Sequence, residues 1–151
     1  MASLSTNGRI IINFQLCHCL STPYDTLSLQ PQQESLTFYQ QSFSEFTFNE
    51  GQYDLVNAQF SLPFTSPDTF TEVWDKIVSS LLSGGVFAGQ LFGPEDGFAD
   101  RSEMTFLDRQ AVENLFTSFT VRTFVESKRT SKTATGHDKF WHIFDVMAVK
   151  S

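Results

Sequence analysis

The stretch from Tyr53 to Phe64, YDLVNAQFSLPF, constrains the fold most, because it predicts a strand that ends in a loop just before a helix. Its apolar centre, Leu55-Val56, is bounded by polar residues, which is typical of a strand buried in a parallel sheet. Ser66-Pro67-Asp68 then has helix-start chemistry: a capping hydroxyl, a proline at the first helical position and an acid in the first turn. Ligands of open α/β sheets bind beyond the carboxyl ends of strands, so residues Asn57 to Phe64 are the first candidate functional segment.

The segment after Ser66 predicts an amphipathic helix. Its apolar residues recur at spacings of three and four and define one face: Phe70, Val73, Trp74, Ile77, Val78, Leu81 and Leu82. Ser83-Gly84-Gly85 is expected to end this helix, because glycine is favoured just beyond a helix C-terminus. Val86 to Phe92 predicts the next strand, which Gly93-Pro94 interrupts.

Further elements are predicted on both sides of this unit. Arg9 to Gln15 and Leu36 to Phe43 each begin with β-forming residues, and Asn49-Glu50-Gly51 has turn chemistry. A second helix is expected from Asp108, with its apolar residues inward: Val112, Leu115 and Phe116.

The end of the chain predicts two strands, Phe119 to Glu126 and Phe140 to Val149, joined by a polar loop over residues 127–137. Two strands joined without a helix pair antiparallel. The order of strands and helices therefore predicts an α/β protein: a three-layer, mostly parallel sheet with a C-terminal antiparallel strand pair. With 151 residues, the chain suffices for a single domain.

The composition narrows the possible partners. The net charge of −7 disfavours nucleic-acid binding, which needs a basic surface. No apolar stretch approaches the roughly 18 residues of a membrane span, and the amino terminus lacks the apolar region of a secretory signal, so we expect no membrane contact and a cytoplasmic location. Cys17 and Cys19 flank His18, but no second cluster completes a zinc site, so we predict no metal.

Several ordered blocks together resemble class I S-adenosylmethionine-dependent methyltransferases, and most nearly the tellurite-resistance-type and related small-molecule enzymes of bacteria. The blocks are YDLVNAQFSLPF, TFTEVWDKIVSSLLSGG, VFAGQLFG, MTFLDRQAVENLF and KFWHIFDVMAVK, within residues 36–151. The resemblance implies a Rossmann-like sheet, S-adenosylmethionine as cofactor and a small-molecule methyl acceptor. Members of the family methylate inorganic oxyanions as well as varied small molecules.

The front of the chain departs from the family pattern. The family's cofactor site uses a Gly-rich turn after an early strand, because only glycine lets the backbone approach the ligand so closely. Here Gly8 and Gly51 are the only glycines before Gly84, and no Gly-x-Gly pattern occurs there. We therefore divide the chain into a divergent segment, residues 1–35, and a methyltransferase-like region, residues 36–151, whose sheet is shortened at its N-terminal side.

The resemblance also suggests site residues. For the cofactor these are Ser42, which stands where the family commonly has an acid that receives the adenine amino group, and Phe43, Asn57, Ala58 and Phe60. For the substrate they are Phe64, Gln90, Trp141 and His142, with Leu62 and Pro63 at the mouth of the site. Each also has a structural interpretation: core packing for the aromatics, and hydrogen bonding for Asn57 and His142. Gln90 lies in an apolar run and must be paired or face a ligand.

No catalytic residue can be named, because methyl transfer needs little beyond alignment of the reacting atoms. The alternative function is a methyltransferase-like protein without activity, such as an assembly partner or a truncated domain. A homodimer is a further possibility, since the strand from Tyr53 would expose an apolar edge. The strand from Arg9 to Gln15 is the candidate to cover that edge, in the same chain or in a partner.

Overall fold

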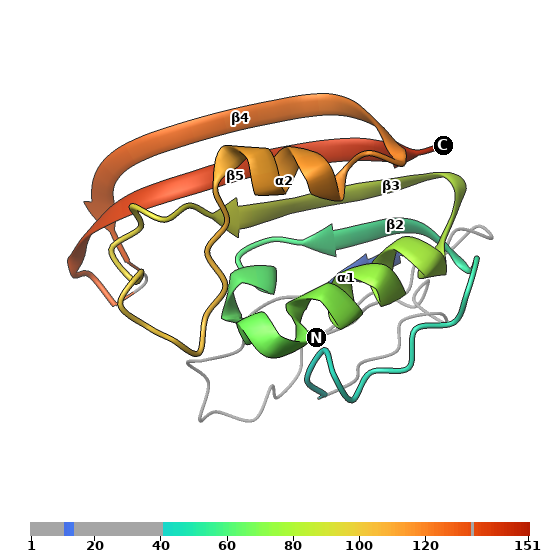
Figure 1. The fold of residues 1–151 in the computed structure, drawn as a ribbon, viewed down its shortest axis with the longest axis horizontal. Helices are drawn as coiled ribbons and strands as arrows, with labels where there is room; N and C mark the ends of the chain where they lie inside the picture. The colour runs from blue at the N-terminus through green and yellow to red at the C-terminus, as the bar shows by residue number, and fades with distance from the viewer. Residues whose placement is uncertain (1–10, 14–40, 134) are drawn as a thin grey trace, which may run out of the picture.

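A computed structural model describes residues 11–13, 41–133 and 135–151 of the chain. Its elements are β1 (Ile11–Asn13), β2 (Tyr53–Ala58), the short 3-10 helix η1 (Leu62–Phe64), α1 (Pro67–Ser80), β3 (Leu81–Phe92), α2 (Arg109–Leu115), β4 (Phe119–Lys132) and β5 (Asp138–Lys150). The five strands form one sheet in the order β1-β2-β3-β5-β4. Both α-helices lie on the same face of this sheet (Figure 1).

The strand directions confirm the predicted α/β class with a mostly parallel sheet. Of the three predicted layers, the described residues form two, since both α-helices lie on one face. β1 pairs with β2, and β2 with β3, in parallel. β5 is antiparallel to β3 and to β4, so it alone runs against the other four strands. The predicted antiparallel pair at the end of the chain is therefore confirmed.

The first strand supports β2 from within the same chain. The strand predicted from Arg9 to Gln15 is confirmed for Ile11–Asn13, where Asn13 lies opposite Asn57. β2 consequently has a neighbouring strand on each side. It is not the exposed edge strand from which the sequence analysis inferred a possible homodimer. The remaining residues of that prediction, together with Cys17, His18 and Cys19, lie outside the described residues.

Helix α1 begins where the sequence predicts. The Ser66 hydroxyl oxygen accepts a hydrogen bond from the Asp68 amide at 3.3 Å, and Pro67 opens the helix. Phe70, Val73, Trp74 and Ile77 are buried, as the periodicity predicted.

The predicted end of this helix is wrong by two residues. Helix α1 stops at Ser80; Leu81 is buried in β3, and Leu82 is exposed. Leu81 leaves the helix because it pairs with Tyr53 of β2, and the ladder resumes only at Leu55 and Val86. Lys150 completes the helix end: its Nζ donates to the carbonyls of Val78 and Leu81, both at 2.7 Å.

The predicted loop at residues 127–137 is also wrong. β4 continues to Lys132, and residues 133–137 alone connect it to β5. In this stretch β4 pairs with β5 from Ser127 opposite Ile143 to Lys132 opposite Asp138. Main-chain hydrogen bonds thus form the strand where its side chains are largely exposed, and β5 begins two residues before the predicted Phe140.

The main core lies between the sheet and the two helices. Trp74 of α1 is at its centre, with ring centroids 5.0 Å from Phe87 and 5.1 Å from Phe116. Phe43, Phe46 and Phe48 pack against the same core. β2 and β3 are parallel neighbours, and the right-handed crossover usual for such strands places α1 on this face of the sheet (Figure 1). Residues 41–43 are not a strand, and the rest of the strand predicted from Leu36 lies outside the described residues.

No helix within the described ranges is both long enough and apolar enough to cross a membrane.

Candidate functional site

The carboxyl ends of the parallel strands form one edge of the sheet, on the left in Figure 1. β2 ends there at Ala58 and β3 at Phe92, while β5 starts there because it runs in the opposite direction. Aromatic side chains from four segments gather at this edge. We call them the edge cluster: Phe60, Phe64, Phe92, Phe98, Phe106 and Trp141.

Phe60 has a backbone conformation that large side chains rarely adopt. Its φ is +48°, in the left-handed region that costs a residue with a Cβ about 1–2 kcal/mol. The Phe60 amide donates to Gln90 Oε1 at 3.1 Å, and Gln90 Nε2 donates to Asp145 Oδ1 at 2.8 Å. A bridge across three segments therefore holds this conformation. The sequence prediction that Gln90 must be paired or face a ligand is met by this pairing.

Three of the predicted site residues meet around this bridge. The Phe60 ring is 40% exposed and lies edge-on to Trp141, with centroids 5.8 Å apart. Phe64 contacts Phe92 from the other side at 6.1 Å. The structure thus brings Phe60, Phe64 and Trp141 into one cluster with Gln90 beneath them, although the resemblance divided them between cofactor and substrate.

A buried ion pair supports the cluster from below. The side chain of Lys139 is 4% exposed and that of Asp96 is fully buried, and the two form an ion pair. The Lys139 ammonium lies 3.5 Å from the centroid of Trp141 and 4.2 Å from that of Phe98. Burial lowers the pKa of Lys139, while the hydrogen bond and charge of Asp96 oppose this shift. Sequence reasoning did not predict this pair, because Asp96 and Lys139 are far apart along the chain and no local pattern connects them.

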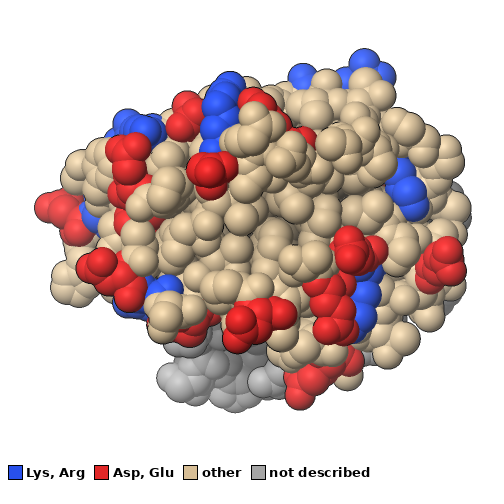
Figure 2. All heavy atoms as spheres, viewed as in Figure 1, with Lys and Arg blue, Asp and Glu red and all other residues tan. Residues whose placement is uncertain are grey.

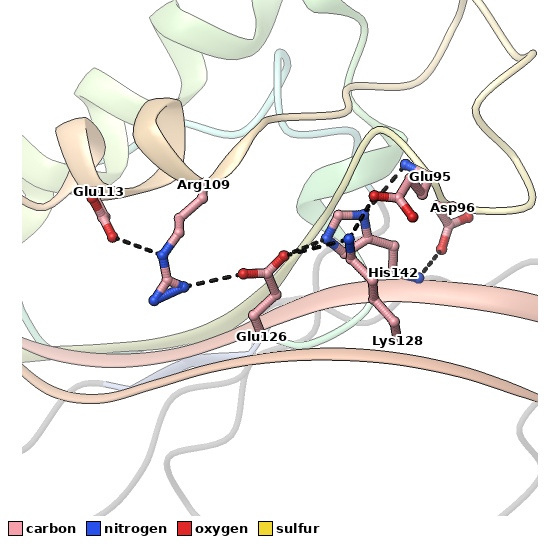
Figure 3. Close-up of polar contacts among 7 residues, drawn as sticks. All are labelled: Glu95, Asp96, Arg109, Glu113, Glu126, Lys128 and His142. Atoms are coloured by element: carbon pink, nitrogen blue, oxygen red, sulfur yellow. Dashed lines mark hydrogen bonds and ion pairs between the residues drawn. The ribbon is translucent and has the colours of Figure 1, made fainter.

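Trp141 and His142 point to opposite faces of β5, as adjacent strand residues do. His142 is 3% exposed and lies on the helix side, in the polar network of Figure 3. Its Nδ1 accepts from the Glu95 amide at 3.3 Å. The ring proton is therefore on Nε2, which donates to Glu126 Oε1 at 2.9 Å. Both ring nitrogens are engaged within the protein, so a substrate role for His142 has no geometric support.

Glu126 connects this histidine to α2. Its Oε2 accepts from Arg109 at 3.1 Å, and Arg109 also pairs with Glu113, as Figure 3 shows. Lys128 lies between Glu126 and Glu95. The hydrogen bond from His142, with a smaller contribution from Arg109, lowers the pKa of Glu126. The network therefore fixes the loop after β3 to β4 and β5, which is a structural role.

We predict that Glu126→Gln removes part of the acid sensitivity of the fold. A carboxylate whose pKa is lowered by folding stabilises the protein above its unfolded pKa of about 4.3, and this contribution is lost as the pH falls through the folded pKa. The stability difference between wild type and Glu126→Gln should thus be largest at pH 6 and shrink towards pH 3 in urea unfolding. Glu72→Gln, in an exposed pair with Lys76, is the control and should change less. A pH-independent difference would contradict this role of Glu126.

The residues predicted to bind the cofactor do not all lie close together. Ala58 is fully buried in the main core, so only its main chain can face a ligand at the end of β2. Asn57 pairs in the sheet with Asn13 and Ala88. Ser42 lies in a separate turn, where its hydroxyl donates to Glu45 Oε2 at 2.7 Å. The described residues show no hydrogen bond from Ser42 to residues 57–60, and Phe43 packs against the main core.

Two buried hydroxyls in the loop after β2 were missed by sequence reasoning. Ser61 Oγ and Thr65 Oγ1 have no hydrogen-bond partner within the described ranges. Ser61 is 3% exposed and directly follows the strained Phe60. A buried hydroxyl without a partner is uncommon in folded proteins. Its position beyond the carboxyl end of β2 adds a polar group to the segment that the sequence had singled out.

The fold is that of an open α/β sheet in which one antiparallel strand, β5, lies between the parallel strands β3 and β4. More particularly, it is the class I S-adenosylmethionine-dependent methyltransferase fold, as similar solved structures show. TehB from Haemophilus influenzae matches with a TM-score of 0.56 and 10% identity over 68% of this chain and 37% of its own. An S-adenosylmethionine-dependent methyltransferase from Methanosarcina mazei matches with a TM-score of 0.52 and 17% identity over 73% of this chain and 65% of its own.

These similarities concern the fold alone, since the identities are low and the chain spans less than two thirds of either protein. No protein-family model matches the sequence, and no curated protein is significantly similar to it.

Proposed function

We propose that the protein is methyltransferase-like, binds S-adenosylmethionine and acts on a small molecule. The observation that carries this proposal is the strained loop at Phe60, directly beyond the carboxyl end of a central parallel strand in a methyltransferase fold. Ligands of such sheets bind at that edge. Backbone strain of this kind is found where function maintains it.

The residues around this loop fit one side of the cofactor. Asn57 and the main chain of Ala58 would line it at the end of β2. The Ser61 hydroxyl, which has no hydrogen-bond partner within the described residues, is a further polar group there. When bound, S-adenosylmethionine supplies a methyl group on a sulfonium centre. The protein's own contribution would be to orient the acceptor and to exclude water, which is the main requirement of methyl transfer. Ser42 and Phe43 remain predicted contacts of the adenine.

A non-catalytic methyltransferase-like protein is the second candidate function. The observation in its favour is the lack of any glycine between Gly8 and Gly51, in the part of the chain where the family has its Gly-rich turn. Such a protein would retain the fold and its edge without binding the cofactor.

Calorimetric titration with S-adenosylmethionine and with S-adenosylhomocysteine separates the two functions. We expect a dissociation constant below about 100 μM, equivalent to roughly 5.5 kcal/mol. Asn57→Ala should weaken binding at least tenfold. Asn49→Ala is the matched control, because Asn49 is exposed before the opposite, amino end of β2 and should leave binding unchanged. No heat from protein that is folded by circular dichroism would refute cofactor binding and favour the non-catalytic function.

A further inference from the structure

The edge cluster presents one aromatic ring to solvent in a fixed position. Phe60 is 40% exposed, and the Gln90–Asp145 bridge fixes its main chain. Its ring is braced edge-on by Trp141 and Phe92. A large aromatic side chain with left-handed backbone and substantial exposure adds little to a core. The arrangement is instead suited to stacking against a planar ligand, since offset and edge-to-face ring contacts are favourable.

The loop beyond β3, which contributes Phe98 and Phe106 to the edge cluster, carries a net negative charge. Residues 93–108, which form the loop beyond β3, contain five acids (Glu95, Asp96, Asp100, Glu103 and Asp108) and one base, Arg101. The basic groups beside the edge cluster are engaged: Lys139 pairs with Asp96, and Arg101 lies over the Phe98 ring at 4.3 Å. Figure 2 shows acidic side chains spread over the face that carries the helices, with basic side chains beside several of them. A ligand with a negative charge would meet repulsion without a basic partner there.

We propose that the edge cluster binds a planar aromatic small molecule that carries no negative charge, with Phe60 as the residue that selects it. This ligand would be the methyl acceptor of the proposed function. Its role as an acceptor rests on that function, whereas its binding at Phe60 does not. An oxyanion, which some members of the family methylate, would not be a ligand of this edge. Phe60 thereby contacts the acceptor rather than the cofactor.

Binding of two matched probes tests the proposal without any cofactor. 2-Naphthamide and 2-naphthoate share one ring system and differ in charge. In calorimetry at low salt we expect 2-naphthamide to bind at least tenfold more tightly than 2-naphthoate, and the difference to shrink in 0.5 M salt because screening weakens the repulsion. Equal or tighter binding of 2-naphthoate would overturn the proposal, as would tight binding of tellurite.

The site of binding can be read from the two tryptophans of the chain, Trp74 in the main core and Trp141 in the edge cluster. In ¹⁵N-¹H spectra, 2-naphthamide should shift the indole signal of Trp141 and leave that of Trp74 in place. A shift of Trp74 alone would place the ligand elsewhere and refute the proposal.

Variants of Phe60 separate ligand recognition from folding. Phe60→Leu should weaken 2-naphthamide binding at least tenfold. Phe140→Leu is the control, because Phe140 is also 40% exposed but alternates with Trp141 along β5 and so faces the other side of the sheet. Phe60→Gly should abolish binding without lowering the melting temperature, since glycine relieves the left-handed backbone. Unchanged binding by Phe60→Leu would overturn the role of this ring.

The outcomes distinguish the two proposals. If S-adenosylmethionine fails to bind but 2-naphthamide binds at Phe60, the aromatic site stands and the methyltransferase function falls. If the cofactor binds and 2-naphthamide does not, the function stands and the aromatic substrate class is wrong.

Discussion

Gly93→Ala is expected to destabilise the protein by roughly 3 kcal/mol or more. A Cβ at this position would lie 2.3 Å from two atoms of the His142 ring, the closest approach at any described glycine. The ring has no room to move, because Glu95 and Glu126 bind its two nitrogens and Gly93 itself donates to the His142 carbonyl at 2.7 Å. Urea unfolding of the wild type and the variant measures the loss.

A double-mutant cycle separates this steric clash from a backbone effect. In a His142→Ala background the ring is gone, so adding Gly93→Ala should cost less than about 1 kcal/mol. Gly136→Ala is the backbone control: no atom lies within 4 Å of its Cβ, and its φ of +84° accounts for a cost of about 1 kcal/mol. Equal losses from Gly93→Ala with and without the His142 ring would contradict the packing argument.

Asp96→Asn is expected to cost about 3–5 kcal/mol, because it leaves the buried ammonium of Lys139 without its counter-charge. The Asp96 carboxylate also accepts main-chain hydrogen bonds from Phe98 at 3.0 Å and from His142 at 3.1 Å. An amide can accept some of these hydrogen bonds but carries no charge. Lys139→Met, which keeps both main-chain hydrogen bonds of Asp96, should cost less.

The loss of unfolding free energy caused by Asp96→Asn should become smaller as the pH rises from 7 to 9.5. Burial already lowers the pKa of Lys139, and Asp96 is the group that holds it up. Without Asp96, folded Lys139 releases its proton at a lower pH than the unfolded chain does. Stability rises with pH wherever the unfolded state binds more protons. Urea unfolding of the variant and the wild type across this range provides the measurement, and a constant difference would refute the argument.

The parts of the fold that could be predicted are those with a local signature. Ser66, Pro67 and the apolar periodicity defined the start and the inner face of α1. Its end was missed because Leu81 and Leu82 continue the period, whereas pairing with Tyr53 draws Leu81 into the sheet. The second half of β4 was missed for a different reason: residues from Ser127 to Lys132 are polar and largely exposed, and their strand depends on a partner that no local pattern shows.

The candidate site was predictable in its location but not in its chemistry. The strand from Tyr53 pointed to the loop that contains Phe60, and the polar Gln90 in an apolar run signalled a partner. That partner, Asp145, belongs to a distant strand, and so does the Lys139 that pairs with Asp96. The strained φ of Phe60 has no sequence signature, since positive φ is predicted from glycine or asparagine and Phe is neither.

The position of β5 has a consequence for protein synthesis. β5 is the last strand along the chain but lies between β3 and β4, and β4 pairs with no other described strand. While the nascent chain is still on the ribosome, β3 therefore has an open edge from Val86 to Phe92, and β4 has no partner. β5 pairs with both strands once residues up to Lys150 have emerged. A chain terminated soon after Lys132 would present two long unpaired strands, which are surfaces that chaperones bind and from which aggregates grow.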